Sequence, residues 1–143
     1  MTRLWIAMAA VVTAFPSFAQ DIDESDVARW LDGYKLAWET RDAQAAGRLF
    51  TEAALYFETP WSEPFAGSSG VTEYWAGVTA DQRNVSFGYE IIALNGATAV
   101  ARWDAEFELA SADASVAIDG VFIMKFESPD KVSELREWWV VRP

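Results

Sequence analysis

The side chains available for acid–base chemistry in this chain are carboxyls, phenols, amines and hydroxyls, because its 143 residues include no histidine and no cysteine. This composition excludes disulfides, thiolate nucleophiles, Ser-His and Cys-His catalysis, haem ligation by histidine and ordinary zinc sites. We therefore expect neither a metal centre nor a cofactor. Any catalysis would depend on a carboxyl or phenol group whose surroundings shift its pKa.

Glu137 is the carboxylate with the most unusual predicted position. It lies in a strand predicted over residues 131–141, in which successive side chains point to opposite faces. One face carries Leu135, Glu137, Trp139 and Val141, and the other carries Glu134, Arg136, Trp138 and Val140. Because the first face is more apolar, we expect Glu137 to point inward, where desolvation raises the pKa of a carboxyl. It is then a candidate acid or base, or a ligand anchor; the alternative is a glutamate at the rim that reaches water or a neighbouring charge.

Helical periodicity dominates the first half of the chain after residue 20. Acidic residues at 21–26 suit the start of a helix, and the apolar residues that follow recur at helical spacing to about residue 40. Asp42 can cap a second short helix that buries Ala46, Leu49 and Phe50. A strand is then predicted at 53–59, a loop bounded by prolines at 60–64, and a third helix after residue 67.

The second half changes to the two-residue period of strands. Alternation predicts a strand around 85–91, Asn95-Gly96 is a strong hairpin signal, and further strands are predicted at 97–110, 116–126 and 131–141. Helices followed by an antiparallel meander indicate an α+β fold in which a curved, cone-shaped sheet wraps three N-terminal helices. Such a sheet leaves a cavity, and aromatic residues make up 15% of this chain.

Several aromatic residues come from separate predicted elements that would face this cavity. Most aromatic side chains must form an ordinary core, but tryptophan packs incompletely and often lines apolar ligand sites. Tyr34 lies on the apolar stripe of the first helix, so its hydroxyl requires a hydrogen-bond partner, either in the core or on a ligand. The candidate ligand-binding residues are Trp38, Phe57, Thr59, Trp61, Trp75, Trp103, Phe107, Phe122 and Trp139.

Residues 1–19 have the pattern of a secretory signal peptide. A basic residue, Arg3, precedes an apolar run at 4–15, and small residues at 17 and 19 define a cleavage site before Gln20. The alternative, a membrane anchor, needs about 20 apolar residues, and this run is shorter. We therefore expect an exported protein, periplasmic or secreted, whose domain spans residues 20–143.

The balance of charge disfavours two classes of partner. Eleven basic and 22 acidic residues give a formal net charge of −11 at pH 7. This charge repels phosphate backbones and anionic lipid surfaces. We therefore expect no nucleic acid partner, and no membrane association once the signal peptide is removed.

Four segments of the chain follow one another in a distinctive order: WLDGYKLAWETRD at 30–42, LFTEAALYFETP at 49–60, GSSGVTEYW at 67–75 and GVFIMKFESPDKVSELREWW at 120–139. Their order and spacing resemble the nuclear transport factor 2-like superfamily, especially its SnoaL-like and ketosteroid-isomerase-like branch. The resemblance implies a cone-shaped α+β fold, commonly a homodimer, with a ligand cavity in each subunit. It also places Leu135 and Trp139 inside the cone. We then expect Glu137 to project into an aromatic cavity, within reach of Tyr34.

The ketosteroid isomerases of this superfamily use three residues, and their correspondence with this chain is partial. Their first-helix tyrosine matches Tyr34, a candidate catalytic residue, but the base before the proline that ends the first strand falls at Thr59. The protonated acid of the penultimate strand falls at Phe122. Threonine cannot abstract a carbon-bound proton at neutral pH, and the adjacent Glu58 is expected to point to the face opposite Thr59. The resemblance therefore argues against steroid isomerisation.

Three hypotheses of function result. The first is an exported binder of a small hydrophobic, ring-containing molecule. The second is a SnoaL-like enzyme of the isomerase, cyclase or hydrolase type that uses a single pocket carboxylate as acid or base. The third is a dimerisation module. A homodimer is expected in any case, because the outer face of the last strands carries apolar residues that are costly to leave in water: Val121, Ile123, Trp138 and Val140.

Overall fold

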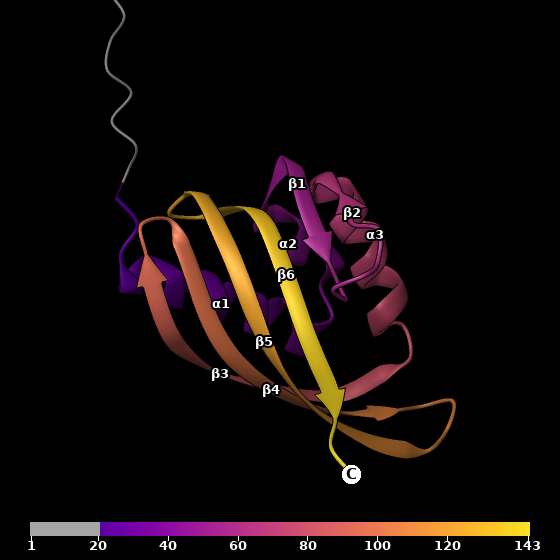
Figure 1. Cartoon of the computed structure of the whole chain (residues 1–143). Coiled ribbons are helices and arrows are strands. Elements are labelled where there is room, and N and C mark those ends of the chain that lie inside the picture. The colour runs from indigo at the N-terminus through magenta and orange to yellow at the C-terminus, as the bar shows by residue number, and fades with distance from the viewer. Residues whose placement is uncertain (1–20) are drawn as a thin grey trace, which may run out of the picture.

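The computed structural model describes residues 21–143, in which a curved sheet carries three helices on its inner side (Figure 1). The predicted signal peptide, residues 1–19, lies outside the described residues. Within the described range, no helix has the length and apolar character needed to span a membrane. The elements are α1 (Glu24–Thr40), α2 (Ala43–Arg48), β1 (Phe50–Phe57), β2 (Phe65–Ala66), α3 (Gly67–Thr79), β3 (Gln82–Asn95), β4 (Thr98–Leu109), β5 (Ala114–Ser128) and β6 (Lys131–Val141).

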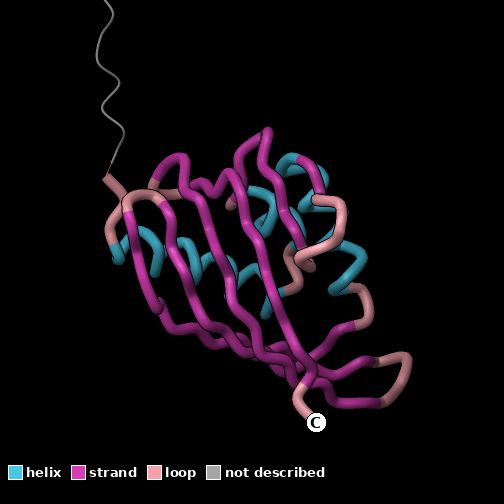
Figure 2. The backbone as a smooth tube through the Cα atoms, viewed as in Figure 1, coloured by secondary structure: helices cyan, strands magenta, loops and turns pink. Residues whose placement is uncertain are grey.

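The six strands form one mixed sheet in the order β2-β1-β6-β5-β4-β3. Strands β3 to β6 are an antiparallel meander, whereas β1 pairs parallel to β6 and antiparallel to the short β2. Figure 2 shows the helices gathered on one side of the strands. The predicted fold class, α+β with a curved sheet wrapped around N-terminal helices, is therefore confirmed.

Aspartates at their N-terminal ends begin the first two helices. Asp23 accepts a hydrogen bond from the Asp26 amide at 3.0 Å, and the Asp26 carboxylate accepts one from the Asp23 amide at 3.1 Å. Asp42 caps α2, as predicted, by accepting a hydrogen bond from the Ala45 amide at 2.9 Å. Each of these contacts satisfies an amide that has no partner within its helix.

The boundary between α2 and β1 differs from the predicted one. The sequence favoured a helix that buries Phe50 and a strand from residue 53, but α2 ends at Arg48 and β1 begins at Phe50. Phe50 pairs with Val132 of β6, whose amide donates a hydrogen bond to the Leu49 carbonyl at 3.0 Å. Pairing with a strand from the far end of the chain therefore overrides the local helical pattern.

Two glycines permit close or unusual backbone geometry in the meander. Gly96 adopts a positive φ of 58° in the predicted hairpin between β3 and β4, where Asn95 pairs with Thr98. Gly120 of β5 lies beneath the indole of Trp103, and a Cβ at this position would stand 2.3 Å from that ring. A side chain at position 120 would therefore displace the largest ring of β4 from its place on the sheet.

The core between α1 and the sheet consists largely of aromatic rings. Phe87, Trp103 and Phe122 come from the adjacent strands β3, β4 and β5, and their ring centroids lie 5.2 to 6.4 Å apart. The ring of Tyr34 on α1 meets that of Phe122 at 5.2 Å. The buried residues of α1 are Val27, Trp30, Leu31, Tyr34, Ala37 and Trp38. This packing holds α1 against the inner face of the sheet and orients the side chains that face the helices.

Candidate functional site

A cavity of about 350 Å³ lies between the inner face of the sheet and helices α1 and α3; we call it the inner cavity. Its polar wall residues are Glu58, Gln82 and Glu137. No lysine or arginine of residues 21–143 lines it. The aromatic wall residues come from five elements: Tyr34, Trp38, Tyr56, Tyr74, Trp75, Trp103, Phe107 and Trp139.

Glu137 projects from β6 into this cavity and is 4% exposed. Its carboxylate accepts a hydrogen bond from the Tyr56 hydroxyl at 2.9 Å, and the Tyr56 oxygen lies 3.1 Å from the Tyr34 hydroxyl oxygen. Since the Tyr56 proton is directed to Glu137, Tyr34 is the donor in the second bond. A chain of hydrogen bonds therefore runs from α1 through β1 to β6.

Burial raises the pKa of Glu137 to about 8. The hydrogen bond from Tyr56 opposes this rise, and the neighbouring carboxylate of Glu58 adds to it. Burial also raises the pKa of Tyr34, Tyr56 and Tyr74 well above the ordinary tyrosine value, and the charge of Glu137 raises it further. At pH 7 the cavity therefore holds a protonated carboxyl among protonated phenols. Such a carboxyl can donate a hydrogen bond, release a proton or, above pH 8, act as a base.

Seven of the eleven predicted site residues line the inner cavity: Tyr34, Trp38, Trp75, Trp103, Phe107, Glu137 and Trp139. The tertiary structure brings them together from α1, α3, β4 and β6. Their roles in binding or catalysis stay predictions. The other four residues, Phe57, Thr59, Trp61 and Phe122, lie outside the cavity wall.

Phe57 and Thr59 lie away from the inner cavity because the alternation of β1 has the opposite phase to the expected one. Parallel pairing sets Phe57 opposite Arg136, whose guanidinium lies 3.9 Å from the Phe57 ring centroid on the outer face. Tyr56 and Glu58 consequently line the inner cavity. Glu58 and Thr59 do face opposite sides, as expected, but the two sides are exchanged. A shift of one residue has this effect on every side chain of a strand.

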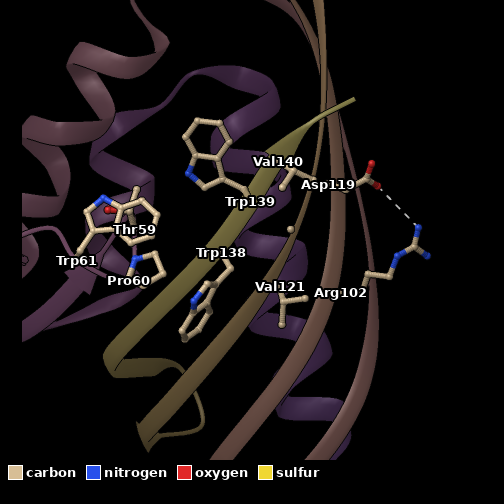
Figure 3. A pocket seen from close by; sticks show the side chains of 10 residues that line it. Thr59, Pro60, Trp61, Arg102, Asp119, Val121, Trp138, Trp139 and Val140 are labelled. Carbon is tan, nitrogen blue, oxygen red and sulfur yellow. Dashed lines mark ion pairs between the residues drawn. The ribbon is translucent and has the colours of Figure 1, made fainter. Parts of the chain in front are cut away.

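Trp61 belongs to a second hollow, of about 760 Å³, on the outer face of the sheet (Figure 3). We call it the outer groove; it is lined by Thr59, Pro60, Trp61, Arg102, Asp119, Gly120, Val121, Trp138, Trp139 and Val140. Trp61 is 86% exposed because β1 ends at Phe57 and a turn follows, in which the Ser62 hydroxyl contacts the Thr59 amide at 3.2 Å. Trp61 therefore lines the outer groove and not the inner cavity.

Phe122 is fully buried rather than part of the cavity wall. Its ring stacks on Trp103 at 5.2 Å, so Phe122 supports a wall residue from behind. Phe122 is also the cross-strand partner of Glu137. The position at which the resemblance puts a protonated acid is thus a phenylalanine, and the buried carboxyl of this site stands on the neighbouring strand.

Sequence reasoning missed Tyr56, Glu58 and Tyr74. The first two were missed because the phase of β1 was misassigned, although the two-residue spacing that links them to Ala54, a small apolar residue, was an available signal. Tyr74 lies next to Trp75, the predicted site residue of α3, and its ring stacks on Phe65 of β2 at 4.2 Å. A periodic pattern does not show that a two-residue strand will cover that side of the helix.

The fold and the cavity together define a class of protein. An unclosed, curved mixed sheet that wraps N-terminal helices around an interior cavity is the cone fold of the nuclear transport factor 2-like superfamily. Within it, a family model described as the SnoaL-like domain matches residues 27–135. The chain belongs to the SnoaL-like family.

Solved structures share this fold at low sequence identity. SalBIII, an epoxide hydrolase/cyclase-like enzyme in pyran ring formation in the polyether salinomycin, is 20% identical, with a TM-score of 0.71 over 82% of this chain and 93% of that one. A hypothetical protein with a ketosteroid isomerase-like fold from Catenulispora acidiphila, in complex with trimethylamine, is 14% identical, with a TM-score of 0.67 over 76% of this chain and 83% of that one. TsrD from Streptomyces laurentii is 13% identical, with a TM-score of 0.69 over 82% and 90%. Among curated proteins, no significant sequence match was found.

Proposed function

We propose that the protein binds a small, hydrophobic, ring-containing molecule in the inner cavity. The observation that carries this proposal is a hollow walled by aromatic side chains from five elements, with one buried carboxyl among them. Ligand sites typically combine an apolar wall with a few fixed polar groups. The volume of about 350 Å³ is near the lower end of the range of about 300–1,000 Å³ for such sites, which favours ligands of one or two rings.

Tryptophan fluorescence tests this proposal directly, because Trp38, Trp75 and Trp103 line the cavity. The purified protein is titrated with naphthoquinones and bicyclic polyketide-like ketones, with a sterol included as the size control. We expect saturable quenching by at least one small ring compound. Val78→Trp, which fills the cavity from α3, should weaken binding at least tenfold, whereas Trp61→Ala in the outer groove should leave it unchanged. Equal effects of both variants, or no saturable quenching, would exclude the cavity as the site.

A second candidate function is acid–base catalysis by Glu137, and the hydrogen-bonded chain Tyr34–Tyr56–Glu137 favours it. A carboxyl whose pKa is about 8 can accept a proton from carbon as its ionised form becomes populated near neutral pH. The proton moves from carbon to the Glu137 carboxylate, and the substrate is left with the negative charge as an enolate. Tyr56, which accepts a hydrogen bond from Tyr34, donates to the carboxylate and holds it in place. The matching reaction class is proton transfer at a carbon next to a carbonyl in a hydrophobic substrate.

Deuterium exchange into 2-tetralone, a bicyclic ketone with weakly acidic C–H bonds, tests this second candidate. We expect the protein to accelerate exchange in D₂O, measured by proton NMR, with a rate that rises with pH and levels off above about 8. Glu137→Gln should abolish the acceleration, and Tyr56→Phe should shift the pH profile. Exchange no faster than with Glu137→Gln across the whole pH range would leave binding as the function.

The homodimer is a separate proposal. It rests on the outer groove, where the apolar residues Val121, Trp138 and Val140 are 38%, 41% and 65% exposed. Apolar patches of this kind commonly mark protein contacts, and a stable dimer buries about 1,600 Å² in total. Light scattering should give twice the chain mass at micromolar concentration, and Trp138→Glu should return the protein to a monomer. A monomer in the unaltered protein would refute the proposal.

Export is proposed from residues 1–19 alone. The intact mass of the secreted protein should correspond to a chain that starts at Gln20. A full-length chain in soluble cytoplasmic extract, with no processed form outside the cell, would contradict it.

A further inference from the structure

The two carboxylates of the inner cavity have no basic partner in the part of the chain that the structure describes. Glu58 and Glu137 both line the cavity, and neither takes part in an ion pair among residues 21–143. Glutamate is almost never buried without a partner, because an isolated buried charge is strongly unfavourable. The cavity therefore holds two carboxyl groups, one buried and one half-buried, that no basic residue of its own wall can pair with when they ionise.

The groups that face Glu137 add hydrogen-bonding capacity but no positive charge. They are Tyr56 and Glu58 from β1, Tyr34 from α1 and Tyr74 from α3, while its partner on β5 is an uncharged phenylalanine. Gln82, the other polar wall residue, accepts a hydrogen bond from the Trp38 indole at 2.7 Å. The Tyr56 hydroxyl is the only hydrogen-bond donor to the Glu137 carboxylate among these residues. One carboxylate oxygen is thus left for a ligand.

The rest of the wall is made of aromatic rings, whose faces carry partial negative charge. Trp38, Trp75 and Trp103 are nearly completely buried, and Trp38 meets Trp75 and Trp103 edge to face at centroid distances of 5.2 Å and 5.9 Å. A cation placed within about 6 Å of the centroid of an aromatic ring is attracted to its face, and tryptophan attracts it best. An apolar cation gains from both the rings and the carboxylate, whereas a neutral molecule of the same shape gains only from burial.

We propose that the ligand of the inner cavity carries a positively charged nitrogen, as an alkylammonium or arylammonium group, that sits among the tryptophan rings and pairs with Glu137. The proposal rests on the proposed binding function and names the chemical class of the ligand. It also predicts an exchange of charge: the cation enters as the Glu137 carboxyl releases its proton to solvent. Affinity for the cation must then increase as the pH rises toward 8.

Phenyltrimethylammonium and its uncharged carbon isostere, tert-butylbenzene, separate charge from shape. At pH 8.5 we expect the cation to bind at least tenfold more tightly, by tryptophan fluorescence. With the Glu137 pKa at about 8, one-proton linkage predicts that its affinity rises about eightfold between pH 7 and pH 8.5, while tert-butylbenzene shows no change. Calorimetry in buffers of different ionisation enthalpy should detect the release of nearly one proton per cation at pH 7.

Variants assign the effect to the cavity carboxylates. Glu137→Gln should reduce the preference for the cation to about threefold or less and remove its pH dependence, with little change for tert-butylbenzene. Glu58→Gln should reduce the preference by a smaller factor, and Trp61→Ala should have no effect. Circular dichroism checks that each variant is folded. If Glu137→Gln is not folded, the pH dependence of cation affinity and the proton release on binding, both measured on the unaltered protein, test the proposal instead.

Each negative outcome has its own meaning. Equal affinity for the two probes, with no pH dependence, overturns the cation proposal and leaves the binding function standing. If neither probe binds although quinones or ketones do, the cation proposal is again wrong. If no compound of either set binds, the proposed binding function itself fails.

Discussion

The inner cavity and the outer groove are both lined with tryptophan and valine, but their charged groups differ in exposure to water and in pairing with a counter-charge. In the outer groove Arg102 and Asp119 pair with each other at 3.8 Å, and both side chains reach water (Figure 3). In the inner cavity Glu137 is buried, and a tyrosine hydroxyl is its partner. The groove is the larger hollow, yet its charges are already balanced.

This difference shows that apolar lining and volume alone do not define a site for chemistry. A charged group that is paired and solvated keeps its ordinary protonation state. A buried carboxyl without a counter-charge has a shifted pKa, so it can change its protonation state or bind a ligand. The groove has the properties of a surface that packs against another protein, and the cavity has those of a small-molecule site. Four measurements test whether the two regions differ as much as their surroundings imply.

The largest expected effect is the loss of a buried ring from the cavity wall. Trp103→Ala removes an indole that stacks on Phe87 and Phe122, and it should lower the free energy of unfolding by about 3–5 kcal/mol. Trp61→Ala in the outer groove should change it by less than about 0.5 kcal/mol. Urea denaturation of both variants measures the contrast; similar losses would mean that Trp61 is packed in solution.

The second effect is the pH dependence that Glu137 gives to stability. Its pKa in the folded state, about 8, lies above that of an exposed glutamate, so its contribution is complete at low pH and is lost as the pH rises toward 8. Between pH 5 and pH 8 the protein should lose about 4 kcal/mol relative to Glu137→Gln. The difference between the two denaturation curves isolates this carboxyl from all other acids. A difference that does not vary with pH would place Glu137 in water.

A smaller effect is expected from the hydroxyl that links Tyr34 to Glu137. Tyr56→Phe removes both hydrogen bonds of the chain and should lower the free energy of unfolding by about 1–2 kcal/mol. Because this hydrogen bond lowers the pKa of Glu137, its loss should raise that pKa further. Carbon-13 NMR of the glutamate carboxyls follows the titration; an unchanged midpoint would show that Tyr56 does not donate to Glu137.

The smallest effect should come from the paired charges of the outer groove. Arg102→Ala breaks an exposed ion pair with Asp119, and such pairs contribute about 0–1 kcal/mol. We expect a change below about 0.5 kcal/mol in the free energy of unfolding, with no effect on the pH dependence that Glu137 causes. A larger loss would indicate that the groove is desolvated, as it would be in a dimer, and measurements at several protein concentrations would separate that case.

Local patterns in the sequence were enough to predict the fold class and the face of β6 that contributes Glu137 to the site. Two-residue alternation predicted β6 over its observed range, Lys131–Val141, and indicated that Glu137 belongs to its more apolar face. The aspartate cap of α2 and the Asn95-Gly96 hairpin are also local, since each depends on contacts within a few residues. The apolar face of a strand can be recognised from the sequence of that strand alone, without knowing which strands pair with it.

The arrangement of β1 could not be obtained in this way. Its residues alternate as expected, but alternation alone does not say which set faces the helices. The register of its parallel pairing with β6 determines which set faces the helices. As a result, Tyr56 and Glu58 line the cavity and Thr59 lies outside it. The strand also starts earlier than its local pattern indicates, because the Val132 amide of β6 donates a hydrogen bond to the Leu49 carbonyl just before the strand begins.

The sequence by itself therefore determined the three helices and the longer strands, which face of β6 is apolar and which residue types are available for chemistry. Only the tertiary structure decided that Glu137 meets a tyrosine pair and a second carboxylate without any basic residue of the described chain beside them. The physical reason is that burial and pairing of a charge depend on groups brought together from distant parts of the chain. A periodic pattern reports which side chains share a face, but it carries no information about what that face meets.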